Sequence, residues 1–75
     1  MAAVLRLGKT EPLQGIDWVV VEHAATGDYR ASGLSAVEDV VFGPHRYNSE
    51  REAVGAAQAW ALHNAVPVIY VREPA

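Results

Sequence analysis

The chain has 75 residues, no cysteine and a formal net charge of −3. This length is typical of one domain, so we expect residues 1–75 to fold as a single unit. Without cysteine there are no disulfide bonds and no thiolate metal ligands, and stability must come from an apolar core or from association with another chain. The negative charge argues against nucleic acid as a partner, because a basic face supplies most of the affinity for phosphates.

The composition favours a soluble, cytoplasmic protein. Hydrophobic residues make up 51% of the chain, which is ample for a core, but no run approaches the ~20 apolar residues of a membrane span. Arg6 lies inside the short apolar run at the start, whereas a signal peptide places its charge before a longer apolar stretch. The small size is typical of bacterial or phage-borne proteins.

Residues 1–15 are expected to form an edge strand or a loose arm, followed by a loop. The segment Ala2–Leu7 is apolar enough for a short strand. Residues 9–15 contain few side chains that would enter a core, and Pro12 and Gly15 favour a loop there.

The run Ile16–His23 predicts a central strand. It contains three consecutive valines beside Trp18, all strong β formers, and its apolar residues do not alternate with polar ones. We therefore expect both of its faces to be covered. The segment Ala24–Asp28 is a turn signal, and Tyr29–Ser32 returns as the second strand of a hairpin.

Residues 34–43 fit two structures. Ser35 and Glu38 form the pattern of a capping box, which indicates a helix. The run Val37–Phe42 is also rich in β formers and lies between strand-like segments, so a strand is favoured and a short helix stays open. Gly43 and Pro44 are typical of a helix stop or a turn.

A long helix is predicted from Glu50 to about Asn64. Ser49 is a natural N-cap, and Glu52 completes a capping box three residues later. One arc of the helix is apolar and should face the core; it contains Ala53, Val54, Ala56, Ala57, Trp60 and Ala61.

The run Val66–Val71 predicts a last, interior strand, with Pro67 tolerated only at its beginning. The predicted fold is therefore α+β, with an antiparallel or mixed sheet of three to four strands and one long helix packed on one face.

No catalytic, cofactor or metal site is predicted. The three histidines, His23, His45 and His63, are 22 and 18 residues apart, which is not a metal-ligand spacing. Glu22 and His23 are neighbours in a strand and should point to opposite faces, so they cannot share a proton. A domain this small also has little room for a pocket of ~300 Å³ or more, so we expect a protein that is not an enzyme.

The segment from Gly43 to Tyr47 reads as a loop that carries His45 and Arg46. Together with Lys9 and Arg30, these residues would form a surface able to touch phosphates or bases. This is the basis of an alternative prediction, a nucleic-acid-binding module.

The back of the predicted helix carries a second apolar stripe, Gly55, Ala59 and Leu62, with His63 on its border. Solvent-facing helix positions usually carry charge, and an exposed glycine costs about 1 kcal/mol relative to alanine. Two explanations stay open: the N-terminal arm folds over the stripe, or a second chain covers it, as a homodimer or as another protein.

The favoured function is a small binding or accessory protein that occupies a surface on another protein. Chains of this size and class are common among phage and mobile-element products that inhibit host machinery, and that analogy rests on size and class alone. A nucleic-acid-binding module is the alternative, and a minimal enzyme is the third.

Overall fold

The computed structural model describes residues 2–8, 13, 17–36 and 39–72 of the chain. Its elements are, in order, β1 (Ala3–Leu7), β2 (Asp17–His23), β3 (Tyr29–Ser35), β4 (Val40–Tyr47), α1 (Glu50–His63) and β5 (Val68–Arg72).

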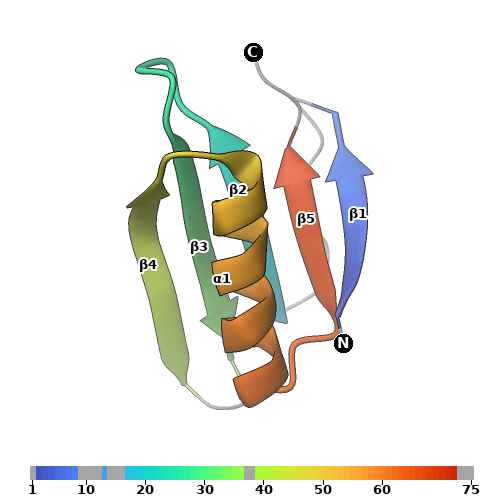
Figure 1. Cartoon of the computed structure of the whole chain (residues 1–75). Helices are drawn as coiled ribbons and strands as arrows, with labels where there is room; N and C mark the ends of the chain where they lie inside the picture. The colour runs from blue at the N-terminus through green and yellow to red at the C-terminus, as the bar shows by residue number, and fades with distance from the viewer. Residues whose placement is uncertain (1, 9–12, 14–16, 37–38, 73–75) are drawn as a thin grey trace.

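The five strands form one mixed sheet in the order β1-β5-β2-β3-β4, and α1 crosses one of its faces (Figure 1). The strands β1, β5 and β2 run parallel, while β2, β3 and β4 form an antiparallel meander. The predicted α+β class, with one helix on a small mixed sheet, is confirmed. The sheet has one strand more than predicted, because the segment expected as an edge strand or arm pairs with β5 as β1.

The core lies between α1 and the middle of the sheet. Its sheet side includes Val19 and Ile69, both fully buried. The helix contributes Ala53, Ala57 and Ala61, also fully buried. Because these three residues recur every fourth position and are all alanines, the helix axis lies close to the strands.

The central strand β2 is buried on both faces, as predicted. Val19 and Val21 pack in the core beneath α1, while Val20 points to the opposite face and is still only 3% exposed. The neighbouring hairpin is confirmed too, with Gly27 at a φ of +93° in its turn. β3 then runs on to Ser35, three residues further than predicted.

β4 confirms the strand prediction in part and corrects the loop prediction that followed it. Residues 40–42 are strand, whereas 37–38 lie outside the described residues. The segment after Phe42 was expected to be a loop, but the strand continues through a bulge to Tyr47. Gly43 makes this possible with a φ of +67°, and a Cβ there would lie 2.4 Å from the carbonyl oxygen of Ala31.

The helix begins and ends where the sequence indicates. The side chain of Ser49 accepts from the backbone N–H of Glu52, and the chain turns out of the helix after Asn64, whose N–H donates to the Trp60 carbonyl. The last strand is confirmed with shifted bounds: β5 begins at Val68, after Pro67, and not at Val66, and it ends at Arg72. In the part of the chain that the structure describes, no helix has the length and apolar character needed to cross a membrane.

Candidate functional site

The outer face of α1 is formed by Gly55, Ala59, Leu62 and His63, and all four are exposed. This follows from the helical period: the fully buried alanines point to the sheet, so residues about half a turn away point to solvent. Leu62 is 72% exposed, and a Cβ built on Gly55 would meet nothing within 4 Å. The predicted stripe therefore exists and faces outward.

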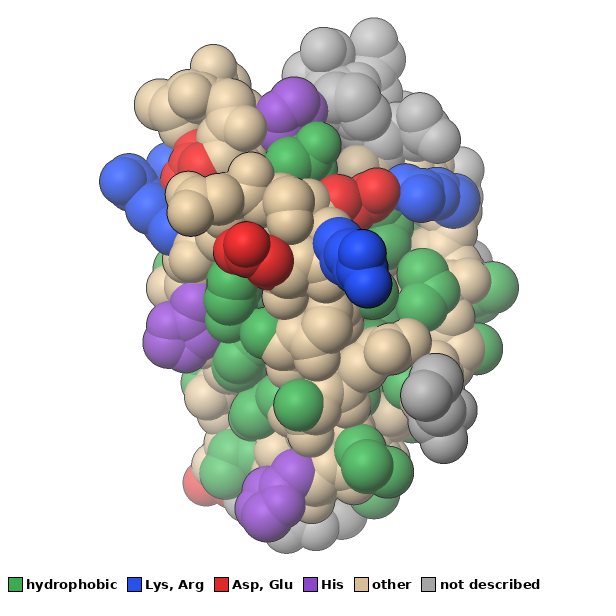
Figure 2. All heavy atoms as spheres, viewed as in Figure 1, with side chains coloured by type: hydrophobic (Ala, Val, Ile, Leu, Met, Phe, Trp, Pro, Cys, Tyr) green, Lys and Arg blue, Asp and Glu red, His purple; other side chains and the backbone are tan. Residues whose placement is uncertain are grey.

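The outer face of α1 lacks charge over most of its length. Residues 53–62 contain no Asp, Glu, Lys or Arg; Arg51 and Glu52 precede this stretch, and His63 follows it. In Figure 2, which looks onto α1, charged side chains gather near the start of the helix, while hydrophobic and uncharged surface covers its front below. An uncharged surface with polar ends is typical of a protein contact.

An apolar hollow of about 260 Å³ borders Leu62 at the end of the helix. It lies where α1 turns into β5, beside Ala2. Every residue that lines it has an apolar side chain: Ala2, Ala61, Leu62, Ala65, Val66 and Pro67. The exposed leucine thus belongs to a larger apolar surface.

Residues 3–7 do not cover the outer face of α1, so the explanation that Val4, Leu5 and Leu7 fold over the stripe is wrong. Residues 3–7 form β1 at the edge of the sheet, next to β5 (Figure 1). Backbone pairing with β5 places this segment there, and the N–H of Ala3 donates to the Pro67 carbonyl at 3.0 Å. Among the described residues, the stripe faces solvent.

The structure brings together three of the four residues of the predicted basic surface, Arg30, His45 and Arg46. Arg30 and Arg46 lie directly opposite one another on β3 and β4, and with His45 and Pro44 they line a hollow of about 220 Å³. Lys9 lies outside the described residues.

Carboxylates accompany both arginines of this surface. The Nε of Arg46 is 3.4 Å from the Asp28 carboxylate, and Glu22 lies opposite Arg30 on β2. Since each arginine has an acidic neighbour, the surface is less basic than the sequence predicted.

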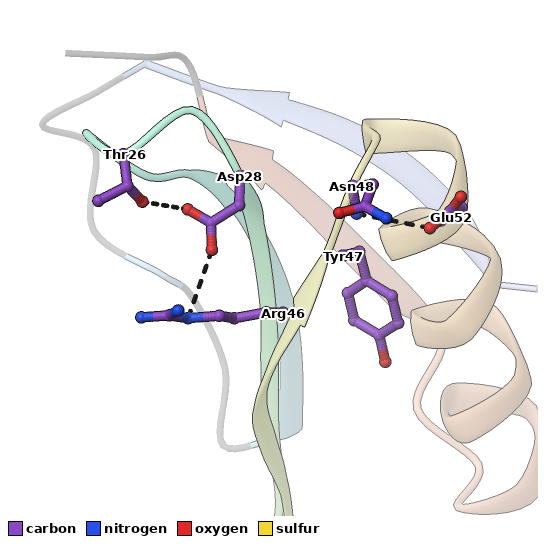
Figure 3. Close-up of a pocket in the computed structure, with 6 residues that line it drawn as sticks. All are labelled: Thr26, Asp28, Arg46, Tyr47, Asn48 and Glu52. Carbon is purple, nitrogen blue, oxygen red and sulfur yellow. Dashed lines mark hydrogen bonds and ion pairs between the residues drawn. The ribbon is translucent and has the colours of Figure 1, made fainter.

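A polar hollow of about 390 Å³ opens beside the hairpin turn and the start of α1 (Figure 3). It is larger than the ~300 Å³ for which we expected little room, but polar side chains form its walls. These are Thr26, Asp28, Arg46, Tyr47, Asn48 and Glu52.

Electrostatics in the polar hollow centre on Asp28. The hydroxyl of Thr26 donates to its carboxylate and is the main reason that the pKa of Asp28 lies below its ordinary value of 3.8. The backbone N–H of Asp28 and the guanidinium groups of Arg46 and Arg30 also lower the pKa, while desolvation opposes them. The carboxylate is thus held by a hydroxyl and an ion pair.

A second charged cluster was not predicted from the sequence. It lies where the parallel strands β1, β2 and β5 end, next to the start of α1. Arg6 pairs with Glu50 at 2.5 Å, and Arg72 pairs with Glu22 at 3.3 Å. These residues are far apart in the chain. Knowing that β1, β2 and β5 run parallel would have located them, because neighbouring parallel strands end at the same edge of a sheet.

Two of the three histidines make ring contacts, and the third is exposed. His23 stacks on Tyr29 with ring centroids 4.5 Å apart, while its neighbour Glu22 pairs with Arg72. His45 lies against Phe42, and His63 is exposed at the end of α1. Within the described residues, no three His, Asp or Glu side chains gather closely enough to hold a metal ion.

Comparison with known proteins adds no family. No protein-family model, curated protein or solved structure matches the chain.

Proposed function

We propose that this protein is a small binding protein that acts by occupying a surface on another protein, and that the outer face of α1 is its contact surface. The observation that carries the proposal is Leu62, which is 72% exposed beside an apolar hollow at the end of an uncharged helix face. Covering an exposed leucine and its apolar surroundings removes unfavourable hydration, and this favours association.

Gly55 supports the same conclusion from the other end of the face. In an exposed helix interior, glycine lowers stability by about 1 kcal/mol relative to alanine. No packing inside the molecule requires it, because a Cβ there would meet nothing within 4 Å. A glycine at this position would let a partner approach the helix backbone closely.

The test uses a matched pair of substitutions. Leu62 on α1 and Val41 on β4 are 72% and 71% exposed, so each accepts a charge without disturbing the core. We expect wild type and Val41→Glu to capture the same partner from a lysate of the host cell, and Leu62→Glu to lose it. Equal capture by all three chains would contradict the proposal.

A nucleic-acid-binding module is the second candidate, and the pairing of Arg30 with Arg46 favours it. Like charges directly opposite on neighbouring strands lower stability, so a phosphate that bridges them would relieve their repulsion. The carboxylates beside both arginines and the net charge of −3 weigh against it.

Salt dependence tests this second candidate. If both arginines touch phosphates, Arg30→Ala and Arg46→Ala should each reduce the slope of log affinity against log salt by about 1. Oligonucleotide binding that does not depend on salt, or no binding at low salt, would exclude it.

A further inference from the structure

Among the described residues, β1 forms one edge of the sheet. It pairs with β5 on its inner side, and Figure 1 shows no described segment on its outer side. Two of its side chains are exposed hydrophobics: Val4 is 41% and Leu5 is 49% exposed. An open edge of this kind is a template for another strand.

The direction of the β1 backbone shows which groups face outward. The N–H of Ala3 donates inward, to the Pro67 carbonyl before β5. Because both backbone groups of a strand residue point to the same side and successive residues alternate, the N–H and C=O of Val4 point away from β5. They are positioned to pair with an incoming strand.

The opposite edge of the sheet is protected. β4 contains Pro44, which has no N–H to donate, and a bulge between the positions paired with Ala31 and Gly33 interrupts its register. β1 has neither feature. Its single charge, Arg6, is paired with Glu50 of the same chain.

We propose that β1 pairs with β1 of a second copy of this chain, antiparallel and around a two-fold axis at Val4. Directly opposite residues of an antiparallel pair have their side chains on the same face of the sheet. A two-fold axis normal to the sheet must therefore lie midway between a residue and its own copy. An axis at Arg6 would set two guanidinium groups against each other. An axis at Val4 joins the outward N–H and C=O of Val4 to the same groups of the copy and keeps the two Arg6 side chains apart.

This pairing goes beyond the proposed function. The two-fold axis is normal to the sheet, so both α1 helices lie on the same side of one continuous sheet of ten strands. The outer face of each α1 stays uncovered, because that face points to solvent and away from the sheet in which the strands pair. The assembly would therefore present two identical contact surfaces in one direction, which strengthens binding to a partner that offers two sites.

Sedimentation equilibrium over a range of concentrations up to about 1 mM tests the pairing, since a contact through one short strand is weak. Wild type should approach twice the chain mass of 8.1 kDa. Val4→Lys and Val4→Glu should each stay at 8.1 kDa, because position 4 faces itself across the axis. An equimolar mixture of the two variants should recover the doubled mass. Val41→Lys on the other edge is the control and should dimerise like wild type.

Three results would overturn the proposal: wild type that stays at 8.1 kDa, either Val4 variant that keeps the doubled mass, or a mixture that stays monomeric. If circular dichroism shows that a charged variant is unfolded, a synthetic chain with an N-methylated Val4 amide replaces it in the test. This chain lacks the outward N–H of Val4, so the proposal requires it to be monomeric. Leu62→Glu separates this proposal from the proposed function, because it should keep the doubled mass and lose the partner.

Discussion

The rings of Phe42 and Trp60 stack with their centroids 5.3 Å apart and their planes inclined by 18°. This contact joins β4 to α1 at the side of the core. The sequence placed Trp60 on the helix arc that should face the core. In the structure Trp60 is half-buried and packs against a centre formed by Val19, Val21 and Ile69.

Trp60→Ala should lower the free energy of unfolding by about 3 kcal/mol, the lower end of the range for large aromatic residues, because the ring is half-buried. For a domain of this size that is a large share of its total stability. Urea denaturation followed by circular dichroism measures the change. A midpoint equal to that of wild type would show that the stack on Phe42 contributes nothing.

Gly33→Ala should also destabilise the protein, because β2 and α1 both approach β3 closely at this point. A Cβ on Gly33 would lie 2.9 Å from the Trp18 carbonyl oxygen and 3.1 Å from the Trp60 ring. Overpacking of this kind lowers stability by about 1–3 kcal/mol. The same substitution at Gly55, where a Cβ meets nothing within 4 Å, is the control and should raise stability. Equal effects at the two glycines would contradict the packing described.

Ser49→Ala should lower stability by about 1 kcal/mol, because the N–H of Glu52 then loses the acceptor that lies 3.2 Å away. Ser49→Asp keeps an acceptor at the N-terminus of α1 and should retain stability. Thermal melts of the two variants compare them directly. If Ser49→Asp melts as early as Ser49→Ala, the cap does not act through this hydrogen bond.

Thr26→Val should raise the pKa of Asp28 toward 3.8, because it removes the hydroxyl that chiefly lowers it. A carboxyl whose pKa is lowered in the folded protein stabilises the fold above its unfolded pKa, and this stability disappears as the pH falls through the folded pKa. Thr26→Val should therefore be less stable than wild type above the unfolded pKa of the carboxyl, and this difference should disappear at lower pH. An NMR titration of the Asp28 carboxyl checks the shift, and an unchanged pKa would contradict it.

The sequence predicted the helix and the hairpin turn correctly, because both depend on residues that are close together in the chain. The helix from Glu50 follows from Ser49 and from the spacing of its alanines, and the same periodicity placed Gly55 and Leu62 on the outer face. The turn around Gly27 followed from its composition in the same way. These signals depend on neighbours within a few residues.

Other features depend on contacts between distant parts of the chain. β1 lies in the sheet because it pairs with β5, about 65 residues later, and no local pattern shows that register. Gly43 and Pro44 carry the usual signal for a stop, yet β4 passes through them because β3 pairs with it on both sides of the bulge. The charged cluster of Arg6 and Arg72 needed the parallel order of the strands, which the sequence did not reveal.

Site-specific photo-cross-linking tests the outer face of α1 most directly. A photoreactive residue at position 59, in the middle of that face, should link the protein in its host cell to a partner of distinct mass. The same residue at position 41, which is also exposed but lies on β4, should not form this product, because Val41 is not part of the outer face of α1. No product at position 59, or the same products at both positions, would contradict the account of α1 as the contact surface.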